Sequence, residues 1–136
     1  MPKALKREPT SEEYSQAAAL REALRLFQRR TEEVTAAHGL TPRVYQLLLM
    51  IKTSGDGDER TGLGELEERL QLGRSTVTEL VQRTEKRGLV RRDLDRDRGR
   101  GISIMLTANG KRRLAAALAE LGDERRRLID ILSRLA

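Results

Sequence analysis

The chain has 136 residues and a net charge of +6; 38% of its residues are hydrophobic, 35% are charged and only three are aromatic. This length predicts a single domain over residues 1–136 with a modest aliphatic core. The absence of cysteine excludes disulfides and thiolate chemistry, and with no membrane-length apolar run and no apolar signal segment we expect a cytoplasmic protein.

A long first helix is predicted from about Thr10, because Thr10 and Glu13 have the spacing of a capping box. Behind this start, apolar or small side chains recur every three or four residues, which is typical of a coiled-coil seam. Gly39 is expected to end the helix. The seam comprises Ala17, Leu20, Leu24, Phe27, Thr31 and Val34.

Three shorter helices are predicted next. Thr41-Pro42 is an N-cap followed by proline at the first helical position, and the loop 54–58 ends that helix. A second short helix covers about 63–70, with Leu66 and Leu70 buried, and the tight turn 71–73 separates it from a third helix over about 74–87. We expect that third helix to bury Val77, Leu80, Val81 and Thr84.

The period of the pattern then changes from that of a helix to that of a strand. Val90, Arg92 and Leu94 alternate with charged residues, and Ile102, Ile104 and Leu106 alternate after a charged, glycine-containing stretch. This pattern predicts a β-hairpin. A final helical region begins after Thr107, is interrupted at Gly122-Asp123, and carries an apolar stripe at Leu114, Leu118, Leu121, Leu128, Leu132 and Leu135.

The stretch from Leu63 to Thr107 resembles the MarR family of bacterial regulators. The resemblance lies in LGELEERLQLGRSTVT at 63–78, in ELVQRTEKRGLV at 79–90, and in the hairpin with its Leu106-Thr107 exit. It implies a mainly α fold with a small β-hairpin wing, that is, a winged helix-turn-helix. The winged helix-turn-helix would form a DNA-binding lobe at 41–107, and dimerisation helices would lie at 10–38 and 108–136. The wing stretch 95–100 lacks the proline that is common in this family.

A helix-turn-helix followed by a wing is a DNA-docking arrangement, since the second helix enters the major groove. The predicted apolar back of the 74–87 helix leaves a polar front, and arginine, glutamine, serine and threonine suit base edges or phosphates. The stretch 74–100 has nine basic and five acidic residues, so it holds +4 of the +6 net charge. The predicted DNA-binding residues are Arg74, Ser75, Thr76, Thr78, Glu79, Gln82 and Arg83, with Arg96, Arg98 and Arg100 in the wing reaching the minor groove.

Two long apolar stripes exceed what one winged-helix lobe can cover, so the sequence predicts a homodimer. The two terminal helices could also pack on each other within one chain. A symmetric dimer would read a near-palindromic operator with half-sites roughly 34 Å apart. The predicted dimerisation residues are Leu20, Leu24, Phe27, Leu118, Leu121, Leu128, Leu132 and Leu135.

The resemblance also implies a small-molecule effector bound between the dimer helices and the DNA-binding lobe. Candidate residues for such a crevice are Arg21, His38, Arg43 and Tyr45, although a single histidine at a helix end is also an ordinary structural or solvent-facing group. The identity of an effector does not follow from the sequence.

Two function classes compete with DNA binding. An enzyme is not expected, because there is one histidine, no cysteine and no phosphate-binding glycine motif; we predict no metal site and no cofactor. A winged-helix module that binds a protein partner is the alternative. The sequence therefore predicts a sequence-specific double-stranded DNA-binding transcriptional regulator, acting as a repressor.

Overall fold

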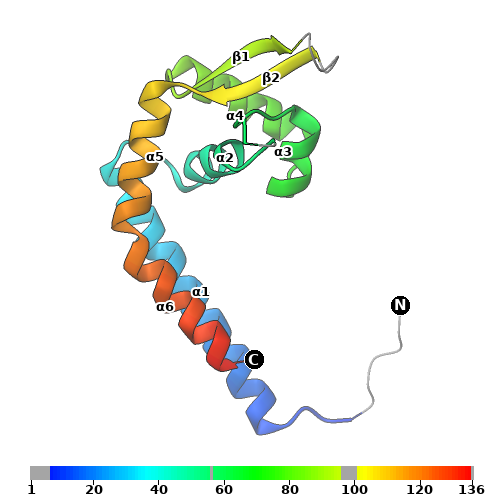
Figure 1. Ribbon diagram of the computed structural model, residues 1–136. Helices are drawn as coiled ribbons and strands as arrows, with labels where there is room; N and C mark the ends of the chain where they lie inside the picture. Colours follow the sequence, from blue (N-terminus) through cyan, green and yellow to red (C-terminus); the bar gives the residue numbers. More distant parts are fainter. Residues whose placement is uncertain (1–6, 56, 96–100, 136) are drawn as a thin grey trace.

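The computed structural model describes residues 7–55, 57–95 and 101–135 (Figure 1). The mainly α fold with one two-stranded antiparallel hairpin confirms the predicted fold class. In chain order the elements are α1 (Ser11–Ala37), α2 (Pro42–Lys52), α3 (Leu63–Leu70), α4 (Arg74–Lys86), β1 (Val90–Asp95), β2 (Gly101–Leu106), α5 (Ala108–Glu120) and α6 (Gly122–Leu135).

The elements form an arm and a lobe. α1 and α6 run side by side as a long arm, α2 to α4 and the hairpin gather at one end of it, and α5 connects the hairpin to the arm (Figure 1). Among the described residues, no helix is long and apolar enough to cross a membrane. This arrangement leaves one side of the lobe free of the arm.

The predicted ends of α1 are confirmed. The Thr10 hydroxyl accepts a hydrogen bond from the Glu13 amide at 3.1 Å, and the Glu13 carboxylate accepts one from the Thr10 amide at 2.9 Å, which completes the capping box. At the other end Gly39 has a φ of +71°, and the Leu40 amide donates to the Thr35 carbonyl at 2.8 Å. The chain therefore turns sharply from the arm into the lobe.

The core of the lobe is aliphatic, as the sequence predicted. The four residues expected on the back of α4, namely Val77, Leu80, Val81 and Thr84, are all buried. Leu66 of α3 is buried too, whereas Leu70 is only half-buried. Other members of this cluster come from α1, α2, β1, β2, α5 and the segments between elements, including Leu47, Leu48, Ile51, Leu89, Val90, Ile104 and Leu114.

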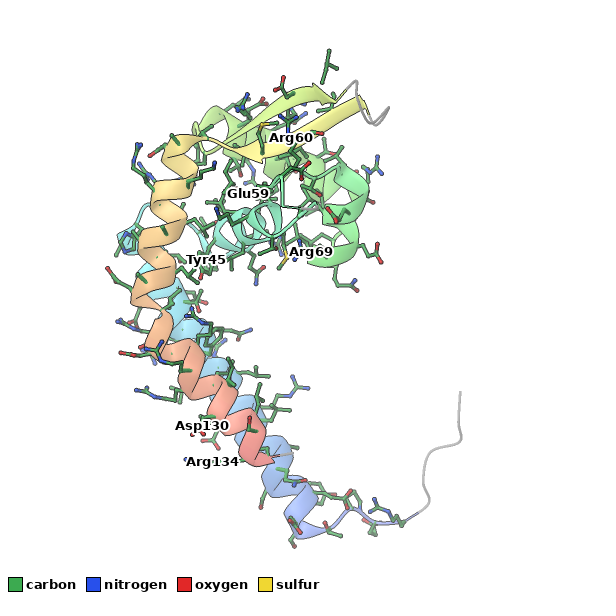
Figure 2. The ribbon with its side chains drawn as sticks, viewed as in Figure 1. Tyr45, Glu59, Arg60, Arg69, Asp130 and Arg134 are labelled. Atoms are coloured by element: carbon green, nitrogen blue, oxygen red, sulfur yellow. The ribbon has the colours of Figure 1, made fainter. Side chains whose placement is uncertain are left out.

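The C-terminal end of α2 is held by an arginine of α3. Arg69 donates to the Met50 carbonyl at 2.7 Å, to the Thr53 hydroxyl at 2.8 Å and to the Ser54 hydroxyl at 3.1 Å, and its side chain lies between the two helices (Figure 2). A cation at a helix C-terminus satisfies carbonyls that lack a partner within the helix. These bonds fix the position of α3 against α2.

Replacing Arg69 by methionine is expected to lower the free energy of unfolding by about 1–2 kcal/mol, because charge-assisted hydrogen bonds are lost while the apolar stem is kept. Urea denaturation followed by circular dichroism measures this change. Arg43→Met on the exposed face of α2 is the matched control and is expected to change stability by less than about 0.5 kcal/mol. Equal effects of the two substitutions would contradict the bridging role of Arg69.

The hairpin is only partly supported by the lobe. Val90 pairs with Leu106 and Leu94 with Ile102, and Thr61 adds a bridge to Ile104, with backbone hydrogen bonds of 2.7 and 3.1 Å. Near its base the apolar face is buried at Val90, Ile104 and Leu106. Further out, Leu94 and Ile102 are 59% and 50% exposed, because the hairpin extends past the lobe beneath it.

The start of α5 lies directly against the segment that joins α4 to β1. The Thr107 amide donates to the Leu89 carbonyl at 3.1 Å, and its hydroxyl donates to the Gly88 carbonyl at 2.6 Å. Arg87, the C-cap of α4, donates to the Gly39 carbonyl. The end of α4 is thus bonded to the turn that follows α1, and the adjoining segment is bonded to α5.

Candidate nucleic-acid interface

The polar front of α4 is presented to solvent by the packing of its back. Arg74, Ser75, Thr76, Glu79, Gln82 and Arg83 are exposed, and Thr78 is half-buried. The turn before the helix depends on Gln71, which adopts a left-handed conformation with a φ of +58° as the C-cap of α3. The structure therefore brings all seven predicted residues of this helix onto one surface element.

The N-terminus of α4 is suited to an anion. Its N-cap is Gly73, which has no side chain to accept from the first amides, and its first turn contains no acidic residue. Free N–H groups and the helix dipole together favour a phosphate at such an end. Ser75 and Thr76 add exposed hydroxyls at the same place.

Two arginines beside α4 are held by carboxylates of neighbouring elements. Arg74 pairs with Glu67 of α3 and keeps 63% of its side chain exposed. Arg92 of β1 pairs with Glu85 of α4 at 2.8 Å and is 41% exposed. Each guanidinium is positioned by one carboxylate and still presents donors to solvent. Arg92 thereby connects the hairpin to α4.

Three of the predicted DNA contacts were assigned to the wing. Arg96, Arg98 and Arg100 lie outside the described residues, so their expected minor-groove role stays a prediction. Within the described strands, Arg91 contacts Asp93 at 3.4 Å.

A groove lies between the start of α3, α4 and the hairpin, and the sequence did not indicate it. It has a volume of about 500 Å³, and its lining is mainly aliphatic side chains and glycines, with two arginines and a threonine. The signal that could have found it is the alternation that places Ile102 and Ile104 on one face of the second strand. The lining residues are Gly62, Leu63, Gly64, Arg74, Thr78, Val81, Arg92, Gly101, Ile102 and Ile104.

In the comparison with protein families, the model of the MarR family matches residues 38–101. The match covers the winged-helix lobe, from the residue after α1 to the first residue of β2. The predicted resemblance to the MarR family is thus confirmed for this lobe. A comparison with curated proteins gave no match.

Solved structures of MarR family proteins share the fold over most of their length. AbsC, a transcriptional regulator from Streptomyces coelicolor, superposes with a TM-score of 0.77 at 24% identity, over 93% of this chain and 84% of that one. Sco3205 from the same organism, solved in complex with DNA, gives 0.74 at 26% identity, over 93% and 79%. A mutant MarR from E. coli complexed with operator DNA gives 0.68 at 18% identity, over 90% and 85%.

The predicted dimerisation residues lie on α1, α5 and α6, except Leu121, which is the C-cap of α5. α1 packs against α6 within the chain, which is one of the two arrangements that the sequence left open. Leu20, Leu118 and Leu132 keep 36%, 36% and 39% of their surface exposed, whereas Leu121 is buried in the core of its own chain. The other four, Leu24, Phe27, Leu128 and Leu135, are half-buried.

The predicted effector residues are not brought together. Arg21 is 17 residues before His38 on α1, about 25 Å along the helix axis. Tyr45 is buried where α2 meets α5 (Figure 2), and burial raises the pKa of its hydroxyl. His38 pairs with Glu120 at 2.9 Å, and Arg43 is exposed on α2. Within the described part of the chain these four side chains line no common pocket.

Metal ligation has no support in the described residues, where no group of three or more histidine or acidic side chains could hold an ion. The acidic loop residue Glu59 instead pairs with Lys52, which lowers the pKa of its carboxyl.

Proposed function

We propose that this protein is a member of the MarR family and a sequence-specific double-stranded DNA-binding repressor that acts as a homodimer on a near-palindromic operator. The observation that carries the proposal is the front of α4, a row of exposed polar side chains beginning at an acid-free helix N-terminus. The lobe 41–107 would bind DNA, and the helices at 10–38 and 108–136 would dimerise. A regulator of transcription acts where the chromosome lies, so we place the protein in the cytoplasm.

Within that site the residues have different tasks. Ser75, Thr76 and the amides of the first turn would contact phosphates and position the helix. Gln82, Arg83 and Thr78 would reach base edges, since glutamine suits adenine and arginine suits guanine. Arg96, Arg98 and Arg100 would enter the flanking minor groove. Arg74 and Glu79 complete the proposed interface.

Selection of bound duplexes from a random pool tests this function. We expect an inverted repeat whose half-sites are about one helical turn apart, and an affinity that falls steeply as salt rises. A reporter promoter that overlaps the recovered site is expected to lose transcription when the protein is added. Recovery of no preferred duplex, or binding that ignores salt, would favour the protein-binding alternative.

The proposed dimer is supported by apolar side chains that α1 and α6 leave uncovered. Leu26 and Ile129 are 68% and 57% exposed, and Leu132 is 39% exposed. Exposed apolar side chains on two helices that pack together are typical of an interface between proteins. Among the described residues no further helix covers this face, whereas a second copy would bring an α1 and an α6 of its own.

Sedimentation equilibrium at micromolar protein is expected to show a dimer for the wild type. Leu132→Arg should shift the equilibrium to monomer, because an unpaired charge would have to be buried at the interface. Glu68→Arg on the exposed surface of α3 is the control and should remain dimeric. A monomeric wild type would refute the proposed assembly.

A further inference from the structure

The turn that joins the arm to the lobe receives hydrogen bonds from two other elements. Residues 38–40 connect α1 to α2 (Figure 1). Arg113 of α5 donates to the His38 carbonyl at 3.3 Å, and Arg87, the C-cap of α4, donates to the Gly39 carbonyl. We call this turn together with Arg87 and Arg113 the junction.

The turn itself is held in place from several sides. Leu40 is buried in the core of the lobe at 4% exposure. The His38 ring contacts the Glu120 carboxylate at the end of α5 at 2.9 Å. Gly39 has no room for a side chain, because a Cβ atom there would meet the Arg113 guanidinium. The turn is therefore a fixed point to which another element can be attached.

Arg87 is the donor in the junction that comes from the lobe. The main packing partners of α4 are α3 and β1, which belong to the lobe themselves. A rotation of the lobe about the arm would carry α4 away from the turn and break the bond between Arg87 and Gly39. The Arg87 side chain is exposed, and an exposed charged contact adds little to the free energy of folding. We therefore expect this bond to restrain the orientation of α4 more than it stabilises the fold.

We propose that Arg87 is a positioning residue that sets the angle between α4 and the arm, and so determines which half-site spacing the protein accepts. In a symmetric dimer joined through its arms, the distance between the two α4 helices depends on how each lobe is held to its own arm. One base pair added between half-sites moves one of them by about 3.4 Å and turns it by roughly 35° about the duplex axis. This inference rests on the proposed function and gives Arg87 a role in it without contact to DNA.

The test measures affinity for the inverted repeat recovered by selection and for the same repeat with one base pair inserted between its half-sites. The insertion is expected to weaken binding of the wild type by at least about tenfold but that of Arg87→Met by less than about threefold, because the freed lobe can turn to follow the displaced half-site. Arg113→Met should also reduce the penalty, since it releases the turn from α5. Lys86→Met is the matched control; it removes the same charge from the exposed last residue of α4 and should keep the wild-type penalty.

A purely structural role of Arg87, or a direct contact with DNA, would give different results. If Arg87 only caps the end of α1, Arg87→Met would lower the urea midpoint and keep the wild-type penalty for the insertion, which would overturn the inference. If Arg87 touches DNA, Arg87→Met would bind a duplex with a single half-site more weakly than Lys86→Met does, which would also overturn it. A wild type that selects no inverted repeat would refute the proposed function itself, whereas these variant results would leave it standing.

Discussion

Replacing Ser75 by glutamate is expected to remove duplex binding while leaving the fold as stable as before. Ser75 is the second residue of α4, it is exposed, and the first turn of that helix has no acidic side chain. A carboxylate there meets the positive end of the helix dipole, which stabilises a helix by about 0.3–1 kcal/mol. The same carboxylate would lie where the proposed interface holds a phosphate.

The size of the binding loss follows from like-charge repulsion. Placing like charges together at an interface costs several kcal/mol, and each 1.4 kcal/mol is about tenfold in affinity. We therefore expect at least a roughly 100-fold weaker complex in fluorescence anisotropy, together with an unchanged or slightly higher midpoint in urea. A weaker complex with DNA together with an unchanged or higher urea midpoint indicates a role of Ser75 in the interface. A lower urea midpoint would instead indicate a role in folding.

Ala108→Glu is the matched control for this substitution. Ala108 is the exposed first residue of α5, whose first turn is also free of acidic residues, and it lies where β2 ends, at the base of the hairpin. The variant has the same net charge as Ser75→Glu and gains the same kind of dipole interaction. Its affinity for DNA should stay within a few-fold of the wild type. Equal losses of DNA affinity in both variants would mean that the loss in Ser75→Glu comes from the change in net charge and not from its position.

The sequence was sufficient for the elements that depend on local signals. The capping box of Thr10 and Glu13 and the N-cap of Thr41 act within one turn of chain, and each lies where the pattern predicted. The predicted break at Gly122-Asp123 falls one residue earlier, at Leu121. The back of α4 was predictable for a similar reason, because the side-chain period of a helix determines which residues share a face.

The sequence was insufficient wherever the outcome depends on residues far apart in the chain. Alternation placed Leu94 and Ile102 on the apolar face of the hairpin, but it contains no information on where the lobe beneath that face ends. His38 and Glu120 are 82 positions apart and lie on different helices, so their ion pair could not be foreseen. Tyr45 was predicted to line an effector crevice, whereas tertiary packing buries it.

Another long-range feature is the close approach of α5 to the segment before β1, which makes the protein sensitive to a substitution at Gly110. Gly110 is buried in the first turn of α5, and a Cβ atom added there would lie 2.1 Å from the Leu89 carbonyl oxygen and 3.0 Å from its carbon. Both atoms belong to the backbone, so no side-chain rotation can make room. The same Leu89 carbonyl accepts the Thr107 amide at 3.1 Å, so a displaced α5 would also strain this bond.

Gly110→Ala is therefore expected to lower the free energy of unfolding by about 1–3 kcal/mol, the usual cost of forcing extra volume into a packed site. Helix propensity alone predicts the opposite sign, since alanine in place of glycine normally stabilises a helix by about 0.5–1 kcal/mol. Gly64→Ala supplies that comparison, because Gly64 lies in the first turn of α3 with open space around its Cβ position. Urea unfolding should show the two alanine variants on opposite sides of the wild type, and a gain in both would mean that α5 does not rest on the Leu89 carbonyl.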